Sequence, residues 1–213
     1  MLFTGQMITA LLNAKPDVWS AEPIDPDKPF KWQTRRKMKE QPAVVSDSDA
    51  SWRDAKHDLW VNSKQMADHF SPHEVGQIIY ARETFILKDP YTPTYPVFRA
   101  TADVDRYSGH KWKPGIHMPR AIARLWFIVK RVRVERVNAI SEADALAEGI
   151  RWPDRDGRPY RPPIDLTGMS KLRIAGERFG ELFDSINGTG AFDRGDWCWV
   201  YDLARISKPK GIE

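Results

Sequence analysis

The clearest strand pattern in the chain is IARLWFIVKRVRVERV, residues 122–137. Its apolar residues change parity partway along, from Leu125, Phe127 and Val129 to Val132 and Val134. Because successive side chains of a strand point to opposite faces, this change predicts a bulge or a sharp bend near Lys130 and Arg131. Long bent strands let small barrels turn corners, so the segment favours a strand-dominated fold with a small barrel.

Shorter patterns around this segment predict the remaining elements. We expect strands over Met1–Thr4, Lys31–Met38, Gln77–Leu87, Val97–Asp103 and Trp197–Ile206. We expect helices over Gln6–Asn13, from Ser141 up to Gly149, and over Ser170–Ile186, where apolar residues recur on one stripe. The predicted fold class is α+β, a small mixed β-barrel with about three helices and long loop insertions.

Stretches rich in proline, glycine and charged residues predict the loops between these elements. They lie at about residues 15–30, 41–74, 104–118 and 152–169. We find neither an internal repeat nor a convincing linker, so we expect a single domain over residues 1–213.

The composition is that of an ordinary globular protein, with 41% hydrophobic and 29% charged residues. A net charge of +4 permits nucleic acid or nucleotide partners without requiring them. The single cysteine, Cys198, excludes an intramolecular disulfide and suits a reducing cytoplasm, where we expect the protein to act. No apolar run reaches the length of a transmembrane helix, so we expect no membrane partner.

A basic run follows the first predicted loop: Lys31-Trp32-Gln33-Thr34-Arg35-Arg36-Lys37. One interpretation is an edge strand whose solvated charges prevent pairing with other strands. The other is a strand that faces an anion or a nucleotide, with Lys and Arg for phosphate and Trp32 to stack on a base. The residues alone leave both interpretations open.

Glu148 stands in the last turn of the short helix that begins at Ser141. Gly149 follows it and is well placed to end the helix. One interpretation of Glu148 is an ordinary exposed glutamate. The other is a carboxyl group that acts in general acid–base catalysis.

Four segments follow one another along the chain: KWQTRR (31–36), VGQIIYARET (75–84), ISEADALAEGI (140–150) and the last strand, 197–203. In this order they resemble the ASCH family, whose members have a PUA-like small β-barrel. The segment IHMPR (116–120) is similar to longer versions of the family in bacteria and phages. The resemblance extends over most of the chain and implies a PUA-like fold.

Some members of this family remove acyl groups from the exocyclic amine of N(4)-acetylcytidine, without a metal or another cofactor. The resemblance implies this activity here, on a small-molecule modified nucleoside, with Lys31, Thr34 and Glu148 as the catalytic group. It also leads us to expect substrate contacts from nearby residues: Trp32, Arg35, Arg36, Tyr80, Arg82 and Glu83. Other members are RNA-binding modules or metal-independent ribonucleases, so RNA binding and RNA cleavage stay open as alternatives.

The three residue types suit amide hydrolysis, which needs a nucleophile, a base and an acid for the leaving amine. In one assignment Thr34 attacks the acyl carbonyl, Lys31 accepts its proton, and Glu148 orients Lys31 or protonates the departing amine. In the other, Glu148 is the base and water is the nucleophile. Backbone N–H groups near Thr34 or a nearby arginine would stabilise the oxyanion.

Overall fold

The computed structural model describes residues 1, 3, 5–13, 31–45, 50–54, 59–87, 95–103, 105–150 and 170–212. The chain divides into two compact units. The first consists of residues 1–32, 78–128 and 204–213, and the second of residues 33–77 and 129–203.

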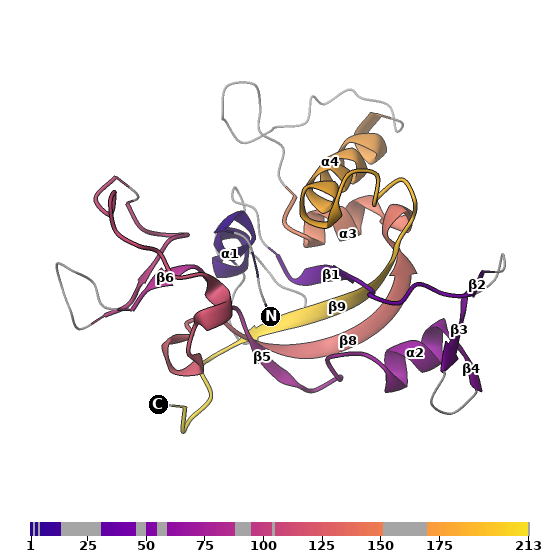
Figure 1. The fold of residues 1–213 in the computed structure, drawn as a ribbon, viewed down its shortest axis with the longest axis horizontal. Coiled ribbons are helices and arrows are strands. Elements are labelled where there is room, and N and C mark those ends of the chain that lie inside the picture. The colour runs from indigo at the N-terminus through magenta and orange to yellow at the C-terminus, as the bar shows by residue number, and fades with distance from the viewer. Residues whose placement is uncertain are drawn as a thin grey trace. The chain divides into compact units, whose positions relative to one another are not determined.

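Helices and strands both contribute to the described part of the chain (Figure 1). The α-helices are α1 (Gly5–Leu12), α2 (Ser63–His69), α3 (Glu142–Ala147) and α4 (Ser170–Asn187). The strands are β1 (Gln33–Lys37), β2 (Val44–Val45), β3 (Ala50–Asp54), β4 (Leu59–Asn62), β5 (Ile78–Tyr80), β6 (Phe85–Ile86), β7 (Val97–Phe98), β8 (Trp126–Arg136) and β9 (Trp197–Ile206). Short 3-10 helices cover Gly115–His117, Arg120–Ile122 and Val137–Ala139.

The main sheet has four antiparallel strands in the order β1-β9-β8-β5. A three-stranded sheet has the order β2-β3-β4, and β6 pairs with β7. The protein therefore has a mixed α+β fold, as the sequence predicts. Among the described strands the main sheet is open, with β1 and β5 at its edges.

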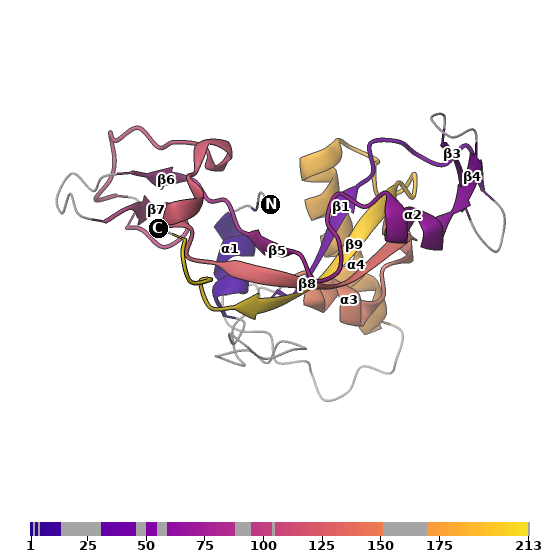
Figure 2. The same ribbon diagram turned by 90° about the horizontal axis from the view of Figure 1, so that it is seen from below.

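In the second unit, α3 and α4 pack against each other, as both views show (Figures 1 and 2). Their shared core joins both helices to β9 through six buried residues: Val137, Ala145, Phe179, Phe183, Ala191 and Cys198. The hydroxyl of Ser141 accepts the backbone N–H of Asp144 at 3.1 Å and so caps the start of α3. Gly149, with φ of +82°, ends that helix directly after Glu148.

The same unit contains the three-stranded sheet, beside which α2 lies (Figure 2). Trp52 pairs in register with Val61, and both side chains are buried. The ring of Trp52 makes an edge-on contact with Trp197 of β9, with 5.4 Å between centroids. This aromatic contact anchors β3 to the main sheet.

The first unit has its own core between β5, β6, β7 and the start of β8. Five buried residues form it: Phe85, Phe98, Met118, Ala123 and Trp126. The buried carboxylate of Glu83 accepts two hydrogen bonds from Arg124, at 2.8 and 2.6 Å. A bidentate pair of this kind fixes the chain between β5 and β6.

Most of the predicted elements are confirmed. The strand predicted over 122–137 appears as β8, which is shorter because 3-10 helices include Ile122 and Val137, and the change of parity appears as two consecutive exposed residues, Lys130 and Arg131. The predicted helices correspond to α1, α3 and α4, and the closing strand is β9. The predicted loops at 15–30 and 152–169 lie outside the described residues.

Three strand predictions fail in whole or in part. Met1 and Phe3 belong to no strand. The predicted strand 77–87 is interrupted between β5 and β6, where Gly115 packs so closely against the backbone of Arg82 and Glu83 that an added Cβ atom would lie 3.1 Å from it. Val97–Asp103 shortens to β7, after which the chain turns at Thr101, whose N–H binds Phe98 O.

The segment 41–74 is not a plain loop, because it contains the three-stranded sheet and α2. Asn62 caps the start of helix α2. Its side chain accepts the backbone N–H of Gln65, and the side-chain oxygen of Gln65 accepts the backbone N–H of Asn62. Such a reciprocal cap stabilises a short helix that has only one buried residue, Met66.

Candidate functional site

Strand β1 carries the residues of the basic run on two faces. It pairs with β9 so that Gln33 lies opposite Asp202 and Thr34 lies opposite Tyr201. Because side chains alternate, Gln33 and Arg35 share the face covered by α3 and α4, whereas Thr34 and Arg36 share the other face.

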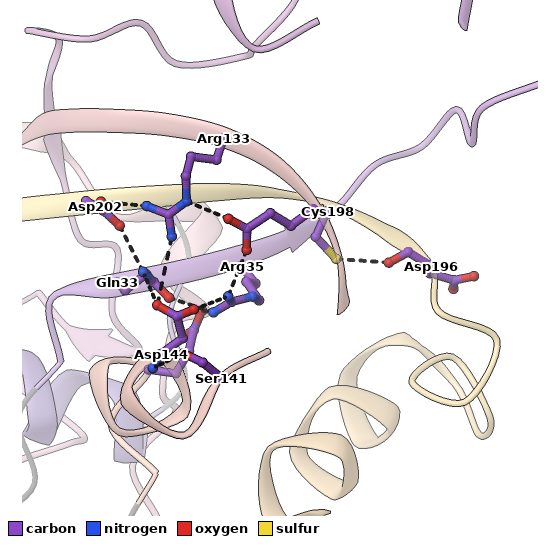
Figure 3. A network of polar contacts seen from close by, with 10 residues as sticks. Gln33, Arg35, Arg133, Ser141, Asp144, Asp196, Cys198 and Asp202 are labelled. Carbon is purple, nitrogen blue, oxygen red and sulfur yellow. Dashed lines mark hydrogen bonds and ion pairs between the residues drawn. The ribbon is translucent and has the colours of Figure 1, made fainter. Parts of the chain in front are cut away.

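Arg35 is the centre of a polar network on the helix-covered face (Figure 3). Its guanidinium is fully removed from solvent and contacts three carboxylates, at 3.1 Å from Glu135, 3.2 Å from Asp144 and 3.5 Å from Glu148. It also donates a hydrogen bond of 2.6 Å to Gln33 Oε1. Glu148 is therefore a buried, ion-paired carboxylate and not an exposed one.

Arg133 of β8 supplies the second guanidinium of this network. It lies 2.6 Å from Glu135 and 2.7 Å from Asp202. The amide of Gln33 donates to Asp202 at 2.9 Å and to Asp144 at 3.0 Å (Figure 3). The two arginines and Gln33 thus tie α3 to β1, β8 and β9.

The carboxyl of Asp144 has a lowered pKa. Burial by itself raises this pKa, but hydrogen bonds from Gln33 and Ser141 and the positive charges of Arg35 and Arg133 outweigh the effect of burial. The ionised form is therefore better stabilised in the folded chain than in the unfolded chain.

We expect Asp144 to contribute a stability that disappears in acid. A carboxyl whose pKa is depressed by folding stabilises the fold above its unfolded pKa of about 3.9, and this contribution is lost as the pH falls through the folded pKa. Urea unfolding of wild type and Asp144→Asn between pH 7 and about pH 3 measures it. The difference in unfolding free energy should be largest near neutrality and shrink in acid; a difference that grows in acid would contradict this linkage.

The opposite face of β1 holds Thr34 and Arg36 beside Tyr201. Thr34 is 1% exposed, and its Oγ1 has no hydrogen-bond partner among the described residues. The Tyr201 hydroxyl lies 3.1 Å from Ser71 Oγ, and the Tyr201 ring contacts the ring of His73 edge-on. A buried hydroxyl without a partner is rare in folded proteins and calls for an explanation.

Arg36 is partly buried, and desolvation lowers the pKa of its guanidinium, although the charges of Glu148 and Tyr201 oppose this effect. Burial also raises the pKa of Tyr201, against the hydrogen bond with Ser71 and the charge of Arg36. Burial lowers the pKa of His73, and the positive charge of Arg36 lowers it further. Around neutral pH this face therefore presents a cation beside a neutral phenol and a neutral imidazole.

Cys198 lies in the core beneath the network, where its thiol points to Asp196 O at 3.6 Å (Figure 3). Burial raises the pKa of this thiol to about 12. We expect the folded protein to resist iodoacetamide at pH 8, with labelling only as fast as the core opens, because the thiolate is the reactive form. Mass spectrometry of native and urea-unfolded samples measures this; rapid labelling of the native sample would contradict it.

The predicted site residues fall in both units. Of those in the second unit, the structure brings Arg35 into contact with Glu148 and places Thr34 and Arg36 on one face of β1. Thr34 Oγ1 makes no hydrogen bond to Glu148. The structure thus joins the short helix to the basic strand through the ion pair of Arg35 with Glu148.

The other predicted residues belong to the first unit. Lys31 is fully buried, and its backbone N–H donates to Ala10 O at 3.1 Å. The guanidinium of Arg82 lies over the ring of Tyr80, 5.5 Å from its centroid. The carboxylate of Glu83 is engaged by Arg124, which gives it a structural role in that unit. Trp32 is partly buried.

Several polar residues of the second unit were not expected from the sequence. Asp202 could have been suspected, because it is a lone carboxylate inside an otherwise apolar strand. Arg133 and Glu135 alternate with Val132 and Val134 along β8, a pattern that equally suits the solvent face of a strand. Ser71 and His73 carry no pattern at all, since only the turn after α2 brings them to Tyr201.

Comparisons with known proteins give no match: no family model, no curated protein and no solved structure matches the chain. Within the described residues, no three or more His, Cys, Asp or Glu side chains gather in a group that could hold a metal ion. In the same residues, no helix combines the length and apolar character needed to cross a membrane.

Proposed function

We propose that this protein is a metal-independent amidohydrolase that removes acyl groups from the exocyclic amine of N(4)-acylated cytosine nucleosides, on a PUA-like barrel. The observation that carries the proposal is the burial of three reactive side chains, Lys31, Thr34 and Glu148. Lysine and glutamate are rarely buried fully unless they serve a partner or a reaction. These three positions are those that the resemblance to the ASCH family assigns to catalysis.

The burial of Thr34 and the lack of a hydrogen bond at its Oγ1 support its role as nucleophile. Its Oγ1 is shielded from solvent and keeps both its proton and its lone pairs uncommitted among the described residues. A hydroxyl in this state is ready to attack a carbonyl carbon when a base takes its proton. Lys31 precedes it by three residues, is fully buried, and carries the amine that the proposed step uses as its base.

The proposed reaction has two balanced steps. Thr34 Oγ bonds to the acyl carbon while its proton passes to Lys31; the C–N bond then breaks, the cytosine amine takes that proton, and an ester on Thr34 remains. Water next attacks the ester, gives one proton back to Thr34 Oγ, and releases the carboxylic acid. Glu148, held by Arg35 at 3.5 Å, positions these groups or delivers the proton to the amine.

Ultraviolet-monitored hydrolysis of N(4)-acetylcytidine and of a bulkier N(4)-acylcytidine tests the proposal. We expect wild type to form cytidine, and Lys31→Ala and Glu148→Ala to lose about 10²-fold or more in kcat/KM while circular dichroism shows that they stay folded. A folded wild type that turns over neither substrate would refute the proposed function.

RNA binding is a second candidate, favoured by the charge of residues 99–124. This stretch has six Lys and Arg against two Asp, a net charge of +4 that equals that of the whole chain. Five of the cations are exposed: Arg99, Arg106, Lys111, Lys113 and Arg120. If this is the function, binding of a single-stranded RNA should weaken steeply with salt, and Lys111→Glu with Lys113→Glu should flatten that dependence.

A further inference from the structure

Gln33 of β1 lies in the polar network around Arg35, and every hydrogen-bonding end of its amide is in use (Figure 3). The residue is only 1% exposed. Its amide nitrogen donates to Asp144 at 3.0 Å and to Asp202 at 2.9 Å, and its amide oxygen accepts a bond of 2.6 Å from Arg35 Nη1. A buried amide whose donors and acceptor are all bonded keeps one orientation.

The charges around Gln33 determine which end of the amide faces which partner. If the amide were turned over, its oxygen would face two carboxylates and its N–H groups would face a guanidinium, which has no acceptor. Asp202 is itself held in place, because its other carboxylate oxygen pairs with Arg133 at 2.7 Å. The oxygen of Gln33 therefore stays directed at Arg35.

The guanidinium of Arg35 depends on this oxygen at one of its two ends. Its Nη2 contacts Glu135 at 3.1 Å and Asp144 at 3.2 Å, and its Nε has no hydrogen-bond partner among the described residues. Its Nη1 lies between Gln33 and Glu148, and the contact of 3.5 Å with Glu148 is the longest of the three ion pairs. Without Gln33, the two shorter ion pairs at Nη2 would draw the guanidinium away from Glu148.

We propose that Gln33 is a positioning residue, whose amide oxygen holds Arg35 Nη1 against Glu148 and so keeps the Glu148 carboxylate where it acts. The contribution to turnover rests on the proposed function, whereas the restraint on Arg35 does not. Glutamine suits this position because a glutamate could accept from Arg35 but could not donate to Asp144 and Asp202.

The restraint on Arg35 can be measured without any turnover, by NMR of the arginine side chains. A guanidinium that is held at both Nη atoms rotates slowly and gives separate Nη signals. We expect separate Arg35 signals in wild type and merged signals in Gln33→Met, which keeps the bulk of the side chain. The matched control is Gln41→Met, because Gln41 also makes three hydrogen bonds, to Met38 O, Trp197 O and Trp197 N–H, but none in the network. It should leave the Arg35 signals separate.

Hydrolysis of N(4)-acetylcytidine measures the contribution to turnover. Gln33→Met should lower kcat by about tenfold with little change in KM, and Gln41→Met should stay within about twofold of wild type. In a Glu148→Ala background, Gln33→Met should lower kcat no further, because Gln33 acts through Glu148. Urea unfolding establishes that each variant is folded under the assay conditions.

Separate Arg35 signals in folded Gln33→Met would overturn the proposal, as would merged signals in wild type. An equal loss of kcat from Gln33→Met with and without Glu148 would overturn the positioning role, since a general structural effect gives that result. Merged Arg35 signals in Gln33→Met together with no turnover by wild type would support the restraint on Arg35 and refute the hydrolase.

Discussion

Replacing Thr34 by valine is expected to lower the turnover of N(4)-acetylcytidine by about 10³-fold or more and to leave the fold at least as stable as wild type. Valine has nearly the shape of threonine but lacks the nucleophilic hydroxyl. Thr34 is 1% exposed and its Oγ1 has no partner in the described structure, so the substitution breaks no hydrogen bond. Removing an unsatisfied buried hydroxyl should raise the free energy of unfolding by about 1 kcal/mol.

The control is Thr34→Ser, which keeps the hydroxyl and loses a buried methyl group. We expect it to retain turnover within about tenfold of wild type and to lose about 1 kcal/mol of stability. Steady-state kinetics and urea unfolding of the three proteins measure both quantities. Loss of stability in Thr34→Val, or unchanged turnover, would contradict the assigned role of Thr34.

The second large effect concerns stability: Arg35→Met is expected to lower the free energy of unfolding by about 3–5 kcal/mol. Its guanidinium is 0% exposed and faces Glu135, Asp144 and Glu148, of which Glu148 is only 2% exposed. Methionine fills much of the same space but leaves these carboxylates without their shared cation. An uncompensated buried carboxylate costs more than the ion pair contributes.

Arg194→Met serves as the matched control, because Arg194 is 55% exposed where it pairs with Asp196. It should cost less than about 1 kcal/mol. Adding Glu148→Gln to Arg35→Met should recover part of the lost stability, since it removes a buried negative charge that has lost its ion-pair partner. Equal effects of Arg35→Met and Arg194→Met in urea unfolding would contradict the central position of Arg35.

The sequence predicts those parts of the fold in which apolar residues recur in a regular pattern over a long segment. Strand β8 shows its change of parity in the sequence, β9 opens with a continuous apolar run over residues 197–201, and α4 has an amphipathic stripe. The sequence did not predict the paired strands β3 and β4, because their outward residues are polar or exposed. Only a few of their residues, such as Trp52 and Val61, enter the core. Three buried residues spread over two short strands do not form a pattern that distinguishes these strands from a loop.

The sequence predicts which residues belong to the candidate site but not how they are arranged in space. Thr34, Arg35 and Glu148 could be named because they stand in recognisable segments. That Arg35 and not Thr34 contacts Glu148 depends on how α3 packs beside β1, which no local pattern contains. The roles of Ser71 and His73 depend on the path of the chain after α2.

The most direct test of the hydrolase is the ultraviolet time course of N(4)-acetylcytidine with wild type and Thr34→Val side by side, at equal concentration and with folding verified. We expect cytidine to accumulate with wild type and to stay at the uncatalysed level with Thr34→Val. Absence of cytidine with folded wild type, or equal rates for the two proteins, would contradict hydrolysis at Thr34.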